Sequence, residues 1–337
     1  MISTLKKISS PRALKEQIPI DHKLAAARLD AISQIEAILR GEDGRKLFIV
    51  GPCSADDPNA AIDYAVRLSR VAEKIEDRIF VVLRMFTAKP RTRGEGYMGL
   101  LHTPDAPSGE VNIAEGIAAM RRLHVRVASE SGLFTADELL YPEAVRYVDD
   151  IVCYFSVGTR SSDDQLHRFV ASGLDVPVGI KNPLNGNLDS LAASVRTARN
   201  GNEFLFCGEH VRTCGNDRAH PVLRGAVSAN GEHIPNYGYE SVMKISSLCG
   251  GRVIVDVGHS NSGKNENKQC EVLCDVWKIA KQKQEYGSAV AGVMIESYIA
   301  GGSGAAGSMY GRSLTDGCLS FEDTERLLLR AADGMPS

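Results

Sequence analysis

The sequence has no long hydrophobic run and no recognisable secretion signal. None of its apolar stretches approaches the roughly 20 residues that a membrane-spanning helix requires, which argues against an integral membrane protein. Residues 1–7 contain no apolar segment followed by a cleavage site, so we expect no signal peptide. We therefore expect a cytoplasmic protein that does not bind a membrane.

The sequence also lacks a basic excess and closely spaced cysteine pairs. The formal net charge is −3, whereas a nucleic-acid-binding surface usually shows as a strong positive excess. The eight cysteines are scattered and include no Cys-x-x-Cys pair, which argues against a structural zinc finger. Without a secretory context they do not suggest a disulfide framework either, so we expect free thiols.

Short apolar runs are the main feature that is present. Runs rich in Val, Ile and Leu are typical of parallel strands that are buried on both faces. Segments with helical spacing follow most of them, which indicates parallel crossover connections. The 337 residues therefore predict an α/β TIM (β/α)8 barrel. The eight runs are 46–53, 79–84, 133–138, 151–160, 176–181, 204–208, 253–259 and 290–296.

Two segments do not fit the simple strand–helix repeat. Residues 21–40 have helical spacing that ends at Gly41, so residues 1–44 are interpreted as an N-terminal helical extension and 45–337 as the catalytic barrel. Residues 208–250 are long for a loop of such a barrel. We expect a small hairpin there, between 221–224 and 233–235.

Several of the apolar runs end in a reactive side chain, and one set of these fits a metal. A thiol, an imidazole and two carboxylates together suit a divalent transition metal. Each could instead be a packed core residue, since free cysteine is often simply buried. Convergence at one barrel mouth favours the metal site. The four residues are Cys53, His259, Glu296 and Asp316.

A second set of side chains is cationic. Lysine and arginine usually lie on solvated surfaces. Several of these, however, follow buried strands in a chain of net negative charge, and they would grip phosphate or carboxylate groups. Glu138 lies among them as an oriented acid or as a partner for a lysine. The cations are Arg84, Lys89, Arg91, Arg160, Lys181 and Arg224.

The motifs around these residues resemble one family closely. From about residue 11 to 324 the chain is similar to class I 3-deoxy-D-arabino-heptulosonate 7-phosphate (DAHP) synthases. The motifs that carry the resemblance are Gly51-Pro52-Cys53-Ser54, Arg84 with Lys89-Pro90-Arg91-Thr92, Gly158-Thr159-Arg160, Gly179-Ile180-Lys181-Asn182, Leu223-Arg224-Gly225, Gly258-His259-Ser260-Asn261, Met294-Ile295-Glu296-Ser297 and Thr315-Asp316-Gly317-Cys318.

The resemblance implies a TIM barrel enzyme of the shikimate pathway to aromatic amino acids. It would condense phosphoenolpyruvate with erythrose 4-phosphate to DAHP and phosphate. It would use one divalent metal, with Mn²⁺ favoured and Fe²⁺, Co²⁺ or Zn²⁺ also suitable. A homo-oligomer, either a dimer or a tetramer, is expected.

The resemblance also assigns roles to the residues. The family's metal ligands map onto Cys53, His259, Glu296 and Asp316. Lys89, Glu138 and Lys181 would be catalytic. Phosphoenolpyruvate would contact Arg84, Lys89, Glu138, Arg160, Lys181 and Arg224, and the loop containing Lys89, Arg91 and Thr92 would bind erythrose 4-phosphate.

Two alternative functions remain open, and one pocket known in the family is not matched in this sequence. The chain could instead condense phosphoenolpyruvate with arabinose 5-phosphate, although that related family has a different sequence at 89–92. It could also be a non-catalytic barrel that binds phosphoenolpyruvate, although such a barrel has no need of four metal ligands. The pocket that binds a feedback amino acid in enterobacterial members of the family is not matched here, where its positions are Val145, Arg146, Asp175 and Phe206. Inhibition by phenylalanine through that pocket is therefore expected to be weak or absent.

Overall fold

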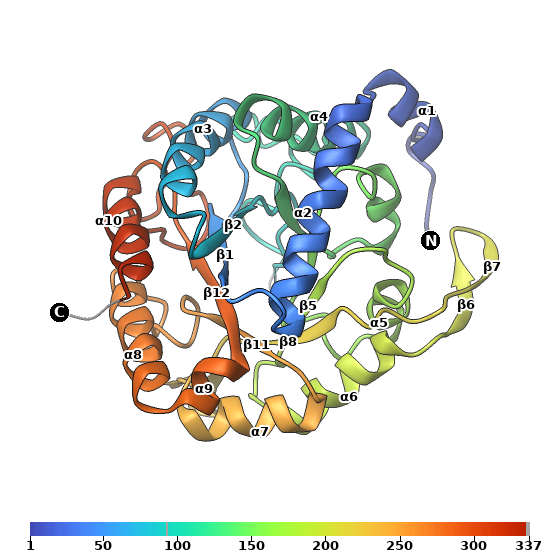
Figure 1. The fold of residues 1–337 in the computed structure, drawn as a ribbon. Helices are drawn as coiled ribbons and strands as arrows, with labels where there is room; N and C mark the ends of the chain where they lie inside the picture. The colour runs from blue at the N-terminus through green and yellow to red at the C-terminus, as the bar shows by residue number, and fades with distance from the viewer. Residues whose placement is uncertain (92–93, 335–337) are drawn as a thin grey trace.

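The computed structural model describes residues 1–91 and 94–334, and its centre is a closed barrel of eight parallel strands (Figure 1). Around the barrel the strand order is β1-β12-β11-β8-β5-β4-β3-β2. The predicted TIM barrel is therefore confirmed. The strands are β1 (Lys46–Gly51), β2 (Ile79–Arg84), β3 (Thr135–Glu138), β4 (Tyr154–Val157), β5 (Val178–Lys181), β8 (Ala219–Leu223), β11 (Val253–Asp256) and β12 (Val290–Glu296).

Helices surround the barrel (Figure 1), and their buried residues are mostly apolar. Most begin at a residue whose side chain accepts a backbone N–H, as Asp57 and Asn112 do for α3 and α4. The helices are α3 (Pro58–Ile75), α4 (Ile113–Ser131), η1 (Pro142–Tyr147), α5 (Gln165–Ala171), α6 (Leu188–Arg199), α7 (Tyr239–Cys249), α8 (Lys268–Gln282), α9 (Gln284–Ala289) and α10 (Phe321–Ala332).

Two helices precede the barrel, α1 (Pro11–Gln17) and α2 (His22–Arg40). α2 ends at Gly41, which is left-handed with φ of 79° as the sequence predicts for a helix stop. It crosses one end of the barrel (Figure 1). Arg28 Nε donates to Val152 O at 2.9 Å, just before β4, and Arg252, just before β11, donates to Ile38 O at 2.6 Å. α2 therefore covers the amino-terminal ends of the strands and leaves their carboxyl ends open.

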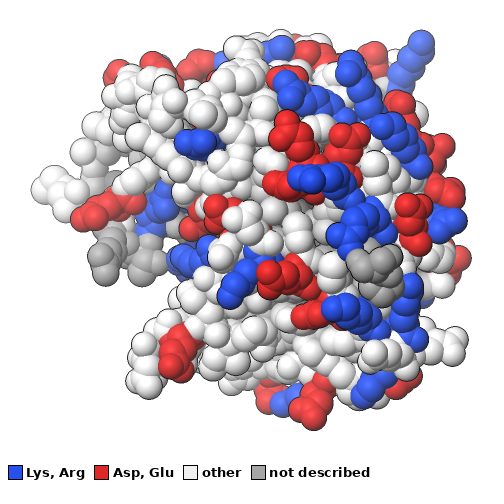
Figure 2. Space-filling view, turned by 90° about the vertical axis from the view of Figure 1, so that its left-hand side faces the viewer, with Lys and Arg blue, Asp and Glu red and all other residues white. Residues whose placement is uncertain are grey.

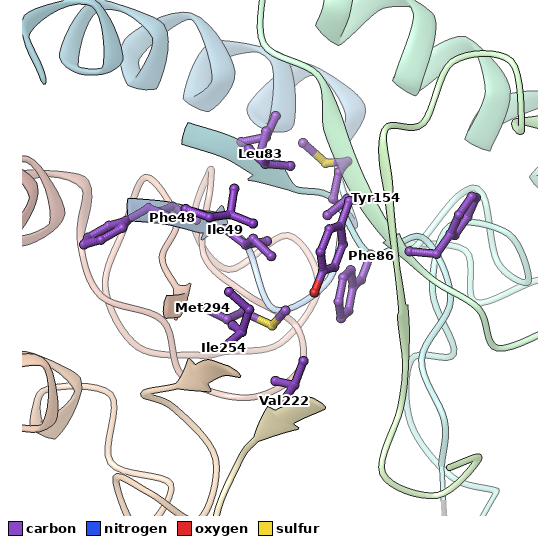
Figure 3. Packing of buried hydrophobic residues seen from close by; sticks show 14 of the residues in the cluster. Phe48, Ile49, Leu83, Phe86, Tyr154, Val222, Ile254 and Met294 are labelled. Carbon is purple, nitrogen blue, oxygen red and sulfur yellow. The ribbon is translucent and has the colours of Figure 1, made fainter. Parts of the chain in front are cut away.

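The barrel interior is filled with side chains. Ile49, Ile254, Met294 and Tyr154 lie next to one another in Figure 3, and each is fully buried. The hydroxyl of Tyr154 lies 2.9 Å from Nε2 of His220, which satisfies both polar groups in the core. The barrel is thus a packed core rather than a pore, and chemistry is confined to its open end.

The expected sixth strand at 204–208 is wrong. β6 (Glu203–Phe206) pairs instead with β7 (Glu209–Arg212) in a separate antiparallel hairpin. Its residues alternate between more and less exposed, and Leu205 is 75% exposed. A strand of this barrel must be buried on both faces, and β6 is not.

The sixth barrel strand is β8, all five residues of which are buried. It was missed because His220 and Pro221 interrupt the apolar run, and proline is uncommon inside sheets. The expected small hairpin does exist but begins later, at β9 (Ala226–Val227) and β10 (His233–Ile234). Helix α7, between that hairpin and β11, was not predicted.

Among the described residues, no helix combines the length and apolarity that crossing a membrane would need.

Candidate functional site

A polar cavity lies at the carboxyl ends of the strands, and most of the predicted site residues line it. The molecule is hollowed at the left-hand edge of Figure 2, on the side opposite α2, and lysine and arginine side chains lie in that hollow. Thr92 was predicted to bind substrate but lies outside the described residues. The cavity is lined by Arg84, Lys89, Pro90, Arg91, Glu138, Gly158, Thr159, Arg160, Lys181, Arg224, His259, Lys264, Thr315 and Asp316.

The four predicted metal ligands meet beside this cavity. The donor atoms of Cys53, Glu296 and Asp316 all lie within 4.8 Å of one another. His259 is not part of that compact group, but its Nε2 lies 3.8 Å from Oε1 of Glu296. A sulfur, a nitrogen and two carboxylates in a largely buried position fit a divalent transition metal.

Positive groups contact the same donor atoms. Nζ of Lys89 donates to the backbone O of Cys53 at 2.7 Å and lies 3.2 Å from its Sγ. Arg84 donates to Oε1 of Glu296 at 3.0 Å. Burial alone would raise the pKa of Glu296, but attraction by His259 and Arg84 outweighs it and lowers that pKa. Glu296 is therefore an ionised donor at neutral pH.

The pKa of Cys53 shifts in the opposite direction from that of Glu296. Burial, reinforced by the negative charge of Glu296, raises the pKa of Cys53. Without a metal ion the sulfur of Cys53 therefore remains a protonated thiol. A bound metal would displace that proton. Loading of the site should consequently release a proton.

Asp256 at the end of β11 was missed by the sequence reasoning. Its Oδ2 accepts from Nζ of Lys181 at 2.8 Å and lies 3.0 Å from Nδ1 of His259. Burial would raise the pKa of Asp256, but the positive charge of His259 and Lys181 holds it well below its usual value. One carboxylate thus orients both a predicted ligand and a predicted catalytic lysine. A charged residue that closes an apolar run was the signal in the sequence.

Phe86 was also missed. Three cations surround its ring: the guanidinium carbon of Arg84 lies 3.9 Å from the ring centroid, Nζ of Lys181 lies 5.7 Å away and Nζ of Lys89 lies 5.9 Å away. Phe86 lies beside Tyr154 at the edge of the barrel core (Figure 3). An aromatic face stabilises cations at such distances and keeps water from one side of them.

Several site residues leave polar atoms available for a ligand. Among the residues that the structure describes, Nε of Arg84 and Nε of Arg224 are buried and have no hydrogen-bond partner. Lys264, which sequence reasoning did not select, lies with its Nζ 3.8 Å from Oδ1 of Asp316. Buried donors without partners are costly, so this cavity is suited to an anionic ligand that accepts from them.

Glu138 faces the cavity because Gly158 makes room for it. A Cβ on Gly158 would lie 2.2 Å from Oε1 of Glu138, so a larger residue would displace the carboxylate. Glu138 therefore adds a carboxylate to a cavity whose other charged side chains are mostly lysine and arginine.

Comparison with known proteins shows which family this chain is similar to. Residues 18–329 match the sequence model described as the DAHP synthetase I family. The chain belongs to this family. It is 34% identical to phospho-2-dehydro-3-deoxyheptonate aldolase of Corynebacterium glutamicum, with 97% of this chain and 91% of the relative covered.

Two further comparisons agree. The chain is 33% identical to the Trp-sensitive phospho-2-dehydro-3-deoxyheptonate aldolase of Escherichia coli K12, with 98% and 96% covered. The solved structure of phospho-2-dehydro-3-deoxyheptonate aldolase from Francisella tularensis superposes with a TM-score of 0.91 at 30% identity, covering 99% of this chain and 98% of that one.

The family, the fold and the enzyme class predicted from the sequence are therefore confirmed. The DAHP synthetase I family catalyses the first step of aromatic amino acid biosynthesis and depends on a metal.

Proposed function

We propose that the barrel mouth condenses phosphoenolpyruvate with erythrose 4-phosphate to DAHP and phosphate. The observation that supports this proposal most directly is that a set of metal-binding side chains lies next to a cluster of buried cations. A compact set of metal donors adjoins a cavity whose buried guanidinium groups include nitrogen atoms that have no hydrogen-bond partner in the described part of the chain.

The cations bind the anionic substrate in this proposal. Nε of Arg84 and Nε of Arg224 donate to the carboxylate and phosphate of phosphoenolpyruvate. Arg160 and Lys181 supply further donors. The same groups stabilise charge on the phosphate as it leaves. Arg91 and Thr92 contact erythrose 4-phosphate, whose phosphate is the second anion to enter.

Lys89 donates the proton that the new alkoxide needs. It is buried, and its ammonium already lies beside Cys53 at the donor cluster. Lys181 is held by Asp256 near the ring of Phe86. Glu138 orients the water that attacks C2.

Cys53, His259, Glu296 and Asp316 would hold one divalent ion, with Mn²⁺ favoured over Fe²⁺, Co²⁺ or Zn²⁺. A bound ion would supply Lewis-acid polarisation of the aldehyde oxygen. We further propose that the enzyme acts in the cytoplasm as a homodimer or homotetramer, which sedimentation at several concentrations would test.

Phosphate release tests the reaction. The purified enzyme is incubated with phosphoenolpyruvate and either erythrose 4-phosphate or arabinose 5-phosphate, with and without excess chelator. We expect phosphate release from phosphoenolpyruvate with erythrose 4-phosphate but not with arabinose 5-phosphate. Excess chelator should abolish that release. Preference for arabinose 5-phosphate, or full activity in chelator, would contradict the proposal.

A further inference from the structure

A buried polar network lies directly behind the proposed proton donor. The carboxylate of Asp137 accepts from the backbone N of Thr87 at 2.8 Å and from its hydroxyl at 2.7 Å. It also accepts from the backbone N of Glu138 at 2.7 Å and lies 3.0 Å from Nε2 of His124. Nδ1 of His124 in turn lies 2.8 Å from the hydroxyl of Thr135.

The position of this network is unusual for a barrel. Successive side chains of a strand point to opposite faces, so Glu138 faces the cavity while Asp137 points outward to α4, which carries His124. That layer between strands and helices is normally apolar. Here His124, Thr87, Thr135 and Asp137 are all at most 2% exposed. A buried carboxylate is costly unless it is fully hydrogen-bonded, and this one is.

The network contacts two of the segments that carry proposed catalytic groups, those of Lys89 and Glu138. Thr87 lies two residues before Lys89, and Glu138 directly follows Asp137. Beyond Thr87 the segment is tied at Lys89, whose backbone N donates to Met98 O at 3.0 Å. The other end of Lys89 reaches Cys53. Small displacements of Thr87 would therefore move the ammonium of Lys89.

We propose that Asp137 is a positioning residue, which together with His124 fixes segment 87–89 and so holds the ammonium of Lys89 at the reacting atoms. This inference rests on the proposed role of Lys89. Asp137 itself does not line the cavity, so it acts through Thr87 and not on the substrate.

The first test compares two isosteric changes. Thr87→Val removes one hydroxyl that ties the segment to Asp137, and Thr135→Val removes a hydroxyl at the far end of the same network. Misplacement of a reacting group by about 1 Å can cost about 100-fold in rate. Thr87→Val should lower kcat at least about tenfold, with KM for phosphoenolpyruvate within about twofold. Thr135→Val should lower Tm similarly and leave kcat within about twofold.

The second test uses rescue at Asp137. In Asp137→Asn the amide oxygen can still accept from the backbone of Thr87 and Glu138. Its NH₂ group can donate to the Thr87 hydroxyl and to Nε2 of a neutral His124, whose proton then sits on Nδ1 and is donated to Thr135. The geometry survives without the charge. Asp137→Asn should therefore keep kcat within about fivefold, whereas Asp137→Ala should lose at least about 100-fold.

Two outcomes would overturn the positioning role: wild-type kcat in Thr87→Val, or an Asp137→Asn variant as slow as Asp137→Ala. Lys89→Ala, measured in the same assay, separates the proposals. If that variant keeps its activity, the proposed role of Lys89 fails. If it is inactive while Thr87→Val is normal, only the positioning inference fails.

Discussion

At the scale of single residues, the site is a balance of buried charges. Arg84, Lys89 and Lys181 share the ring of Phe86, and each also contacts a negative or sulfur-bearing partner. Because these cations are buried, their positions are set by those partners and not by solvent. Replacing Lys89, which contacts the backbone O and the sulfur of Cys53, should change rate more than folding. Replacing Arg84 or Lys181 would take a cation away from buried Glu296 or Asp256 and should also destabilise the fold.

Lys89 gives the sharpest residue-level prediction. Lys89→Ala should lower kcat at least about 100-fold, because it removes both a proton donor and a substrate contact. Lys89→Arg should not restore the rate, since a guanidinium differs in shape and gives up its proton far less readily. Steady-state phosphate release together with Tm measures both effects. Lys244→Ala, on an exposed lysine of α7, serves as the control, and near-normal turnover in either Lys89 variant would reject the role.

Asp56 gives a prediction about pH. Burial raises the pKa of Asp56 to about 6, although Leu314 N and the hydroxyl of Tyr298 donate to it. Because the folded pKa exceeds the unfolded value of 3.8, the stability from its protonated form is complete below about pH 4. That stability is lost as pH rises through about 6.

Asp56→Asn should therefore raise the free energy of unfolding at pH 7 by roughly 2–3 kcal/mol, the equivalent of about two pKa units. It should also flatten the dependence of stability between pH 4 and 7. Urea unfolding at several pH values measures this. Asp77→Asn, at a 72% exposed side chain, is the control. A slope identical to that of the wild type would refute the burial argument.

At the scale of elements, α2 closes the base of the barrel. Ile35 and Ile38 have no exposed surface, and the backbone O of Ile38 accepts from Arg252. The helix is therefore part of the folded core, although it precedes the first strand. Its contribution can be separated from the chemistry because it lies at the opposite end from the cavity.

Ile38→Ala should destabilise the protein by about 2–5 kcal/mol, the usual cost of deleting a buried aliphatic side chain. kcat of the folded fraction should stay unchanged. Leu29→Ala, on the same helix but 60% exposed, should stay within about 0.5 kcal/mol of the wild type. Denaturant unfolding of both variants makes the comparison, and equal stabilities would mean that α2 is only loosely attached.

At the scale of the whole molecule, the sequence predicted the architecture because most barrel strands are uninterrupted apolar runs. It failed at β8, where His220 and Pro221 break the run although every residue is buried. The apolar run at 204–206 was misleading, because only the packed structure shows that β6 is exposed on one face and no more than partly buried on the other.

The site residues, like the strands, could be predicted only where the sequence pattern alone gives their position. Residues at strand ends could be predicted, since carboxyl ends of barrel strands converge. Asp256 carried the same strand-end signal and was overlooked, but its role could not be predicted, because it depends on contacts with Lys181 and His259. Phe86 could not be predicted either, because its role depends on the cations around its ring. Asp137 was hidden further, as it points away from the cavity and acts through a hydrogen bond to another loop.

Metal binding should be visible in the stability of the whole molecule. A ligand that binds only the folded state raises stability by about 2.7 kcal/mol at 100 times its dissociation constant. Excess chelator should therefore abolish turnover and lower Tm, and Mn²⁺ should restore both. Glu296→Gln should remove the Tm response to Mn²⁺. A metal-free enzyme with unchanged Tm and full turnover would contradict the site.

The closeness of two sulfur-bearing residues has a consequence for handling the protein in air. The backbone N of Cys53 lies 3.3 Å from Sγ of Cys318, so the two thiols are neighbours at the donor cluster. Without metal, the small thiolate fraction of Cys53 is left unshielded. Its slow oxidation by oxygen in air gives a sulfenic acid, which the thiol of Cys318 can capture as a disulfide with loss of water. Chelated enzyme should therefore lose activity on aeration and recover with a thiol reductant plus metal. In Cys318→Ala the sulfenic acid has no neighbouring thiol, so the activity lost in air should recover less completely with the reductant. Bound metal would then act as a protecting group as well as a catalyst.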